Sequence, residues 1–269
     1  HLSTRRQRQM CIRDSDEAID DACFRIESLD KTRIGVIWGA GIGGLETFQN
    51  EVLNFAAGDG TPRFNPFFIP KMIPDIAPGM ISIKHGFQGP NFATVSACAS
   101  SANALIDALN YIRLGHADVM VCGGSEACIT IAGVAGFNAL HALSTRNDDP
   151  QTASRPFDKD RDGFVLGEGA GALVIETLEH AQKRGATIYC EIVGGGLSAD
   201  AYHMTAPHPE GIGATLVMEN ALKDANVSAN EVDAINMHGT STPLGDVAES
   251  GALKKVFGDH LYNLSLIHI

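Results

Sequence analysis

Hydrophobic positions along the chain follow two alternating patterns. Short apolar runs rich in β-branched residues predict strands at residues 33–38, 91–97, 118–122, 172–176, 187–193 and 232–237. Apolar residues spaced three or four apart predict helices at residues 45–57, 102–114, 178–184, 213–224 and 243–256. The proline-rich stretch 61–90 predicts irregular chain with short helical pieces. Strands and helices that alternate in this way indicate an α/β fold with mostly parallel strands.

Two of the strand-to-helix junctions share one plan. NFATVSACASSANALIDAL and VDAINMHGTSTPLGDVAESGAL each give a strand, a turn of small residues and a helix. One turn carries a cysteine and the other a histidine. Any two strand–helix units share such a plan, so the likeness favours chance and an internal repeat about equally.

The two ends of the chain differ from the rest. HLSTRRQRQMCIRDS has no hydrophobic period, and NLSLIHI follows directly after the end of a helix. Both resemble translated adapter or linker DNA, although a frayed basic tail is an alternative for the opening segment. We therefore expect a chain that is incomplete at both ends, with four parts: an adapter-like segment (1–15), a first half (16–175), a second half (176–262) and an adapter-like tail (263–269).

Composition narrows the classes of function. The 269 residues are 44% hydrophobic and 19% charged, which is typical of a globular protein. A formal net charge of −12 argues against nucleic acid or an anionic membrane as the main partner. No apolar run is long enough to span a bilayer, and no signal-peptide pattern opens the chain. Six scattered cysteines indicate thiols in a reducing compartment, which predicts a cytoplasmic location.

The stretch VSACASS contains the first candidate for chemistry, Cys98. A thiol at a helix start meets unsatisfied N–H groups and the positive end of the helix dipole, and both favour the thiolate. A small buried residue at a tight turn is an equally good interpretation of Cys98 alone. His238 shifts the balance, because it ends a strand and is followed by a turn rich in hydroxyls, GTST. A cysteine and a histidine at the ends of two strands of one α/β sheet are placed to converge.

Other motifs favour structural interpretations. Gly39, Gly41 and Gly44 fit GxGxxG, but no strand ending in an acid follows about twenty residues later, so a close-packed turn is favoured over a dinucleotide site. DKDRDGFVLGEG nearly matches a calcium loop, but glycine stands where the last carboxylate is required, which favours a solvated, charge-paired loop. We expect neither a metal nor a cofactor.

The remaining cysteines and histidines of interest also have structural interpretations. Cys122 and Cys190 lie in strand-like runs, where a buried cysteine behaves as a small hydrophobe. His203 and His208 lie in a polar loop and are expected at the surface or at a pocket rim, not as metal ligands.

The cysteine and histidine turns resemble active-site segments of the β-ketoacyl-acyl carrier protein synthases, the condensing enzymes of fatty acid synthesis. VSACASS is similar to their nucleophile turn and NMHGTSTPLGD to their first histidine motif. LSTRNDDPQTASRPFDKDRDGFVLGEGAGALVIE is similar to a long family signature, and SADAYHMTAPHPEG to the loop beside the pantetheine tunnel. The resemblance covers about residues 33–258 and is strongest to the elongating type II enzymes. It implies a thiolase-like fold, layered α/β/α/β/α in two pseudo-symmetric halves and here incomplete, that usually forms a homodimer.

The resemblance also implies roles for individual residues. Cys98 would accept an acyl chain from its carrier thioester, and His238 would stabilise the enolate formed when malonyl-carrier decarboxylates. The enolate would attack the acyl-Cys98 carbonyl, giving a 3-oxoacyl thioester and carbon dioxide. Thr240 and Thr242 match positions that hydrogen-bond the pantetheine arm.

Further residues match the acyl pocket and the carrier-docking surface. Ile42 and Phe137 match positions that line the acyl pocket. The partner is an acyl carrier protein, which is acidic in this family. Because this chain is acidic too, docking requires a local basic patch, for which Arg63 and Arg146 are candidates.

The chain departs from the family pattern after the first histidine motif. A second catalytic histidine preceded by a lysine, and a late Gly-rich segment with a gating phenylalanine, are both missing. His268 is not followed by the small-residue helix that the second histidine requires, so it receives no role. We therefore expect an acyltransferase sequence whose chain, taken alone, does not complete the condensation.

Three rival functions remain open. A polyketide-type ketosynthase would keep the same cysteine and histidine motifs. A non-catalytic partner subunit of a ketosynthase would lack the nucleophile, so Cys98 argues against it. An oxidoreductase that uses the loop at Gly39 is the third.

Overall fold

The structure is a computed structural model that describes residues 3–24 and 29–267. Its contacts divide the chain into two compact units, one of residues 1–134 with 167–191 and one of residues 135–166 with 192–269. The sequence placed a single division near residue 175, whereas here segment 135–166 groups with the later part. Backbone hydrogen bonds account for that grouping, because Gly163 N–H donates to Ser241 O at 3.0 Å. Each unit is described by itself.

The first unit is a sheet covered by helices on both faces. Its elements, in chain order, are α1 (Ser3–Asp21), η2 (Lys31–Arg33), β1 (Ile34–Gly39), α2 (Leu45–Ala56), α3 (Phe68–Met72), α4 (Ile76–His85), β2 (Asn91–Thr94), η3 (Ala97–Ala99), α5 (Ser100–Arg113), β3 (Val119–Glu126), β4 (Gly169–Glu176) and α7 (Leu178–Arg184). Helix α6 (Ile131–Ala139) begins in this unit and ends in the other.

The sheet of the first unit has the strand order β2-β1-β3-β4. Strand β1 pairs in parallel with β2 and β3, and β4 pairs antiparallel with β3. All six residues of β1 are buried, as expected for a central strand with neighbours on both sides and helices on both faces. Strand β4 alternates between exposed and half-buried positions, which is typical of an edge strand.

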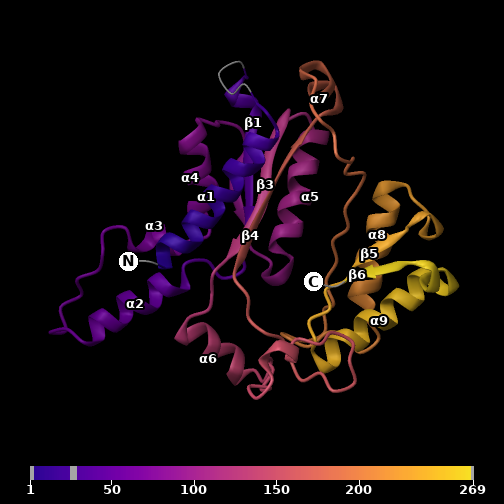
Figure 1. The fold of residues 1–269 in the computed structure, drawn as a ribbon. Helices are drawn as coiled ribbons and strands as arrows, with labels where there is room; N and C mark the ends of the chain where they lie inside the picture. Colours follow the sequence, from indigo (N-terminus) through magenta and orange to yellow (C-terminus); the bar gives the residue numbers. More distant parts are fainter. Residues whose placement is uncertain (1–2, 25–28, 268–269) are drawn as a thin grey trace. The chain divides into compact units, whose positions relative to one another are not determined.

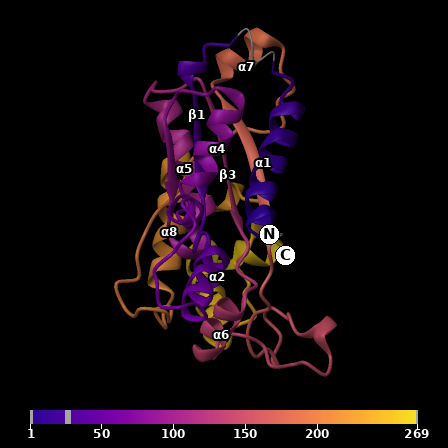
Figure 2. The same cartoon turned by 90° about the vertical axis from the view of Figure 1, so that its left-hand side faces the viewer.

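Alternate residues of the strands pack into two separate hydrophobic cores. Val36 and Val121 pack with α1 and α4, whereas Ile37 and Met120 pack with α5. Figures 1 and 2 show α1 and α5 on opposite sides of these strands. The central strands are therefore held from both sides, and their carboxyl ends can carry loops in a fixed position.

The opening segment, which the sequence places outside the fold, lies in helix α1 from residue 3 onwards. Cys11, Ser15 and Ile19 are buried and recur every fourth residue, so they form one face of the helix. Asp16 pairs with Lys84 and His85 at the end of α4. An adapter origin for residues 1–15 stays a prediction, because a helical conformation fits either origin; residues 1 and 2 lie outside the described residues.

The second unit carries the histidine turn. Its elements are η4 (Pro150–Thr152), α8 (Ile212–Ala225), η5 (Ala229–Glu231), β5 (Ala234–Asn236), α9 (Pro243–Phe257), η6 (Gly258–Asn263) and β6 (Ser265–Ile267). Strand β5 pairs in parallel with β6, which lies in the segment interpreted as an adapter-like tail. Met237, Leu253, Phe257 and Leu261 form its core. Residues 268 and 269, including His268, lie outside the described residues.

One predicted strand is wrong. Residues 187–193 contain no strand, and Cys190 is exposed instead of buried. A β-rich run becomes a strand only when a neighbouring strand supplies hydrogen bonds, and no pairing of this run is found within the described chain.

Candidate active site

Cys98 lies in a tight turn between a strand and a helix. Strand β2 ends at Thr94, η3 spans Ala97–Ala99 and α5 begins at Ser100. Ala97 has a φ of 50°, in the left-handed region that residues other than glycine rarely adopt. The Cys98 side chain is exposed. Ala99, at the N-cap of α5, supplies no capping side chain, so the positive end of the helix is left next to the thiol.

A small network of polar side chains holds this turn. The Ser100 hydroxyl accepts a hydrogen bond from Ser96 N–H at 2.9 Å and donates one to Ala97 O at 2.7 Å. Thr94 Oγ1 donates to Ser100 O at 2.8 Å, and Asn103 Nδ2 donates to Ser96 Oγ at 2.7 Å. Ser100 is only 3% exposed. The turn is therefore fixed by side chains that sequence reasoning did not single out.

The glycines of the GxGxxG motif pack against backbone, as expected. A Cβ at Gly39 would lie 2.5 Å from the Ser100 carbonyl carbon, so the helix start can approach β1 only because residue 39 is glycine. A Cβ at Gly41 would lie 3.2 Å from Ala97 O. Gly44 donates its N–H to Met72 O at 2.8 Å, where a Cβ would meet Lys71 O at 2.3 Å. The motif thus supports the cysteine turn and the start of α2.

Ile42 follows this glycine turn and is 41% exposed. Its backbone N–H donates to Glu126 Oε2, at the end of β3, at 2.8 Å. The other carboxylate oxygen, Oε1, is buried without a hydrogen-bond partner among the described protein atoms. Ile42 therefore presents an exposed side chain from a loop that is tied to β3 through its backbone.

His238 follows β5, and its side chain is exposed. A single carboxylate fixes its backbone, because His238 N–H donates to Glu249 Oε1 at 2.7 Å and Gly239 N–H donates to Glu249 Oε2 at 2.9 Å. Glu249 lies on α9, and the buried Met237 anchors the other side of the histidine. The imidazole therefore projects from a backbone that is held at two consecutive residues.

The threonines beyond His238 bond to each other. Thr240 Oγ1 lies 3.0 Å from Thr242 Oγ1, and Thr242 caps α9 by accepting from Gly245 N–H at 3.2 Å. Between them, Ser241 is fully buried and has a φ of 66°. Both the cysteine turn and the histidine turn thus contain a left-handed residue other than glycine, which extends the likeness of the two junctions to their backbones.

Asp246 organises the histidine turn. Its side chain is 2% exposed and accepts from Ser241 N–H at 3.1 Å and from Phe157 N–H at 2.7 Å. Arg161 Nε lies 3.2 Å from Asp246 Oδ2, and the same guanidinium donates to Thr242 O at 3.0 Å. The calcium-like loop is therefore charge-paired as predicted, but its one arginine, Arg161, is half-buried against Asp246 instead of solvated.

Phe137 is half-buried and meets Phe164 edge-on, with ring centroids 5.4 Å apart. In the first unit, Arg63 is 77% exposed, and its guanidinium lies 3.6 Å from Asp59, which offsets part of its charge. Arg146 has a buried Nε without a hydrogen-bond partner among the described atoms, and its terminal nitrogen donates to Asp160 O at 3.3 Å. Of the two candidate docking arginines, Arg63 is the strongly exposed one.

The cysteines divide by burial. Cys122 is fully buried in β3, and burial raises its pKa to about 12, so it stays a thiol. Burial also raises the pKa of Cys128, with Glu126 adding to the effect. Cys98 differs from both in being exposed.

The structure groups the predicted site residues in two sets. Cys98 and Ile42 lie in the first unit, and Phe137, His238, Thr240 and Thr242 lie in the second. Within each set the turn is held by buried polar contacts. Four residues in these contacts were missed by sequence reasoning: Ser100, Arg161, Asp246 and Glu249.

Family models match almost the whole chain. The model described as "Beta-ketoacyl synthase, N-terminal domain" matches residues 2–181, and the one described as "Beta-ketoacyl synthase, C-terminal domain" matches residues 189–267. The chain belongs to the beta-ketoacyl synthase family.

The chain is also similar to curated proteins of this family. The chain is 48% identical over 260 residues to 3-oxoacyl-acyl-carrier-protein synthase 2 of Coxiella burnetii and 51% identical over 259 residues to the protein of the same name in Staphylococcus aureus. Each match covers 96% of this chain, and 62% and 64% of the respective relative. The chain thus spans somewhat less than two thirds of the length of these beta-ketoacyl synthases.

Solved structures of beta-ketoacyl synthases share the fold. A beta-ketoacyl synthase from Burkholderia phymatum STM815 has a TM-score of 0.87 and 39% identity, over 96% of this chain and 63% of that one. A ketosynthase solved in complex with its type II PKS acyl-carrier protein has a TM-score of 0.90 and 33% identity, over 99% of this chain and 67% of that one. The thiolase-like α/β fold expected from the sequence is confirmed.

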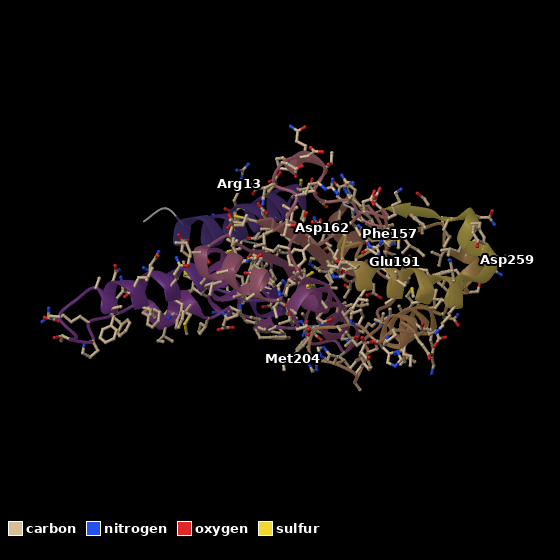
Figure 3. All side chains as sticks on the ribbon, turned by 90° about the horizontal axis from the view of Figure 1, so that it is seen from below. Arg13, Phe157, Asp162, Glu191, Met204 and Asp259 are labelled. Atoms are coloured by element: carbon tan, nitrogen blue, oxygen red, sulfur yellow. The ribbon has the colours of Figure 1, made fainter. Side chains whose placement is uncertain are left out.

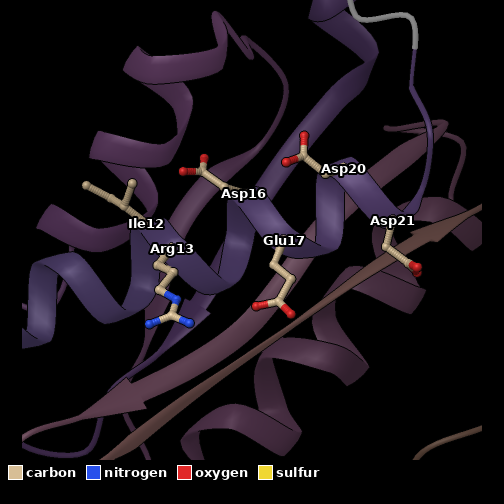
Figure 4. Close-up of a pocket in the computed structure, with 6 residues that line it drawn as sticks. All are labelled: Ile12, Arg13, Asp16, Glu17, Asp20 and Asp21. Atoms are coloured by element: carbon tan, nitrogen blue, oxygen red, sulfur yellow. The ribbon is translucent and has the colours of Figure 1, made fainter.

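Other surface features of this beta-ketoacyl synthase chain are a cavity in the first unit and an exposed methionine in the second. A cavity of about 860 Å³ runs along α1 and is lined by Ile12, Arg13, Asp16, Glu17, Asp20 and Asp21 (Figure 4). Its acidic lining does not suit an acyl chain, and neither turn contributes to it. Met204 projects from the loop before α8 and is 95% exposed (Figure 3).

The histidines of the loop before α8 have structural contacts. His203 and His208 accept backbone N–H groups of their own loop through Nδ1, as structural residues do. Within residues 3–24 and 29–267, no three His, Cys, Asp or Glu side chains are grouped to hold a metal ion. In the same part of the chain, no helix is both long and apolar enough to cross a membrane.

Proposed function

We propose that the protein to which this chain belongs is a 3-oxoacyl-acyl-carrier-protein synthase that extends acyl chains by decarboxylative condensation. The observation that carries the proposal is the exposed Cys98 at the uncapped start of α5, in a turn with a strained backbone. The names of the relatives at 48% and 51% identity support it.

In the first half-reaction, Cys98 Sγ attacks the thioester carbonyl of an acyl carrier protein. The acyl carbon forms a bond to Cys98 Sγ, its bond to the carrier sulfur breaks, and the carrier thiolate takes up a proton. A soft sulfur nucleophile suits thioester exchange, and the N–H groups at the start of α5 can stabilise the oxyanion that forms. Thr240 and Thr242 would bind the pantetheine arm, and Ile42 and Phe137 would line the acyl pocket.

In the second half-reaction, malonyl-carrier loses carbon dioxide and becomes an enolate, whose negative oxygen accepts a hydrogen bond from the His238 imidazole. The enolate carbon then attacks the acyl-Cys98 carbonyl, and the Cys98 thiolate leaves. The product is a 3-oxoacyl thioester on the carrier. The backbone clamp of Glu249 on His238 supports this role, since an oxyanion donor must be held in position before the charge develops.

Two partners belong to the proposal. The first is an acyl carrier protein, and the neighbour solved with its carrier supports this choice. Arg63 is the docking candidate on this chain because it is strongly exposed. The second is another copy of the same protein, in a homodimer.

Acyl transfer to the chain tests the proposal, because this step does not involve the malonyl-carrier or its enolate. Incubation with an acyl-carrier thioester should add one acyl group, located on Cys98 by peptide mass spectrometry. Cys98→Ala should abolish the adduct, and Cys190→Ala, at another exposed cysteine, should leave it intact. Acylation spread equally over the exposed cysteines, or none at all, contradicts the proposal.

A polyketide ketosynthase is the second candidate. The observation that favours it is the TM-score of 0.90 to the ketosynthase of a type II PKS, although the identity is only 33%. The same acylation assay separates the two, with saturated acyl-carrier thioesters competing against carriers that bear a poly-β-keto chain. Preference for the saturated chain supports the fatty acid role.

A further inference from the structure

We propose that Ser100 is a positioning residue for Cys98, whose hydroxyl holds the left-handed turn that presents the thiol at the start of α5. The proposal rests on the role of Cys98 given above. Ser100 does not touch the reacting atoms in this scheme. It acts through the backbone of Ser96 and Ala97, two and one residues before the cysteine.

The turn requires such a device because its backbone is strained. A left-handed conformation costs an alanine about 1 kcal/mol, and it persists only when surrounding contacts fix it. Ala97, with its φ of 50°, directly precedes Cys98, so relaxation of Ala97 would redirect the Cys98 side chain. The hydroxyl of Ser100 bonds to the backbone on both sides of the Ala97 Cα. It accepts a hydrogen bond from Ser96 N–H and donates one to Ala97 O.

The direction of these hydrogen bonds distinguishes positioning from ordinary helix capping. A capping serine accepts N–H groups from the helix that follows it. Ser100 is the first residue of α5, and its hydroxyl bonds backward to the turn. The Ser100 N–H also bonds backward, to Ala97 O, and Ala99 places no capping side chain over the N–H groups that follow.

Burial makes the Ser100 hydroxyl hard to replace. Ser100 is 3% exposed, and removal of its hydroxyl leaves Ser96 N–H without this acceptor, whereas Ala97 O keeps the Ser100 N–H. Two outer contacts keep Ser100 and the turn in register, namely Thr94 Oγ1 on the Ser100 carbonyl and Asn103 Nδ2 on Ser96 Oγ. Gly39 in β1 lets the Ser100 backbone pack directly against the strand, because a Cβ at residue 39 would collide with it.

Alkylation of the chain by iodoacetamide tests the inference without the second half-reaction. The cysteine sulfur displaces iodide from the reagent carbon, and mass spectrometry follows each cysteine separately. The exposed Cys23 and Cys190 serve as internal references in the same chain. We expect Cys98 to react faster than both in the wild type, and Ser100→Ala to slow Cys98 about tenfold while the references keep their rates.

Two further variants sharpen the test. Ser101→Ala changes the next, exposed serine and should leave the rate at Cys98 unchanged. Asn103→Ala removes only the outer contact on Ser96 Oγ, so a smaller slowing is expected. If Ser100→Ala prevents folding, the Asn103→Ala result decides in its place.

Each outcome has one meaning. A Cys98 to Cys190 rate ratio that stays at the wild-type value in Ser100→Ala and in Asn103→Ala overturns the inference. A variant that merely loosens the fold would instead expose the buried Cys122 and lower the melting temperature at an unchanged ratio, which also overturns it. A wild-type Cys98 that reacts no faster than Cys23 and Cys190 contradicts the nucleophile role itself and is distinguishable from both results.

Discussion

The carboxylate of Asp246 illustrates how much a single residue can hold in place. It accepts two backbone N–H groups and pairs with Arg161, and its own side chain is 2% exposed. Asp246→Ala leaves a half-buried guanidinium and two N–H groups without this partner, so we expect the unit to lose about 3 kcal/mol of stability. Hydrogen exchange of α9 measures this loss.

A matched control for Asp246 lies in the same loop region. Asp158 is 46% exposed, and its carboxylate lies 3.9 Å from Arg155. An ion pair of this exposure contributes little, so Asp158→Ala should change the exchange of α9 by less than about 1 kcal/mol. Equal effects of the two substitutions would show that burial of Asp246 is not what matters.

At the scale of single residues, the sequence predicts the reactive side chains but not the polar side chains that hold their backbones in place. Cys98 and His238 were predicted at the ends of strands, and the structure has both in strand–turn–helix junctions. Asp246 and Glu249 gave no such signal, because acids in a helix are ordinary and usually exposed. The burial of Asp246 depends on residues 157 and 161, which are distant in the sequence and which local pattern cannot reveal.

At the scale of elements, the packing of α5 against β1 depends on one glycine. Gly39→Ala would put a Cβ within 2.5 Å of backbone atoms of Ser100, which cannot move aside as a side chain can. We expect a loss of about 1–3 kcal/mol or more, together with slower alkylation of Cys98. Fluorescence of Trp38, the protein's single tryptophan and fully buried in β1, reports the unfolding.

Gly79 provides the control for this substitution. It lies within helix α4 of the same unit, and a Cβ there would meet nothing within 4 Å. Gly79→Ala should therefore stabilise the unit by about 0.5–1 kcal/mol, through the higher helix propensity of alanine. Destabilisation by both alanines would contradict the steric explanation for Gly39.

Elements were predictable where local pattern and tertiary context agree. The helix at 178–184 was predicted with the bounds of α7, and the apolar runs of β1 and β3 became central strands. The run at 187–193 failed because strand formation needs a pairing partner, which no local pattern supplies. The start of α1 was missed for the related reason that its buried face, as far as residues 10–21 show it, consists of the widely spaced Cys11, Ser15 and Ile19.

At the scale of the whole molecule, carboxyl groups whose pKa values are shifted by folding make the stability of the protein depend on pH. Hydrogen bonds from Arg33 lower the pKa of Asp118, and hydrogen bonds from Thr32 lower that of Asp30. Burial alone would raise the pKa of Glu176, but hydrogen bonds from Arg184 and His180 outweigh it and lower the pKa below its ordinary 4.5. Asp107 acts in the opposite direction, because burial raises its pKa.

The sign of the pH dependence follows from these directions. A carboxyl whose pKa is lower in the folded state takes up its proton more readily when unfolded, so its stabilisation is complete above the unfolded value and is lost as the pH falls through the folded one. We expect the first unit, which contains Asp30, Asp118 and Glu176, to keep its stability from about pH 7 to pH 5.5 and to lose it progressively below about pH 4.5.

Glu176→Gln tests whether the charge of this one carboxylate contributes to the loss of stability at low pH. The substitution removes the charge that Arg184 and His180 bind, so at neutral pH it should cost about 2 kcal/mol in urea denaturation followed by Trp38 fluorescence. Below about pH 4.5 the wild-type carboxyl is itself protonated on unfolding, and the two stability curves should converge. A gap that stays constant down to about pH 3.5 would mean that ionisation of Glu176 does not contribute to the pH dependence, and the acid sensitivity would then have to come from Asp118 and Asp30.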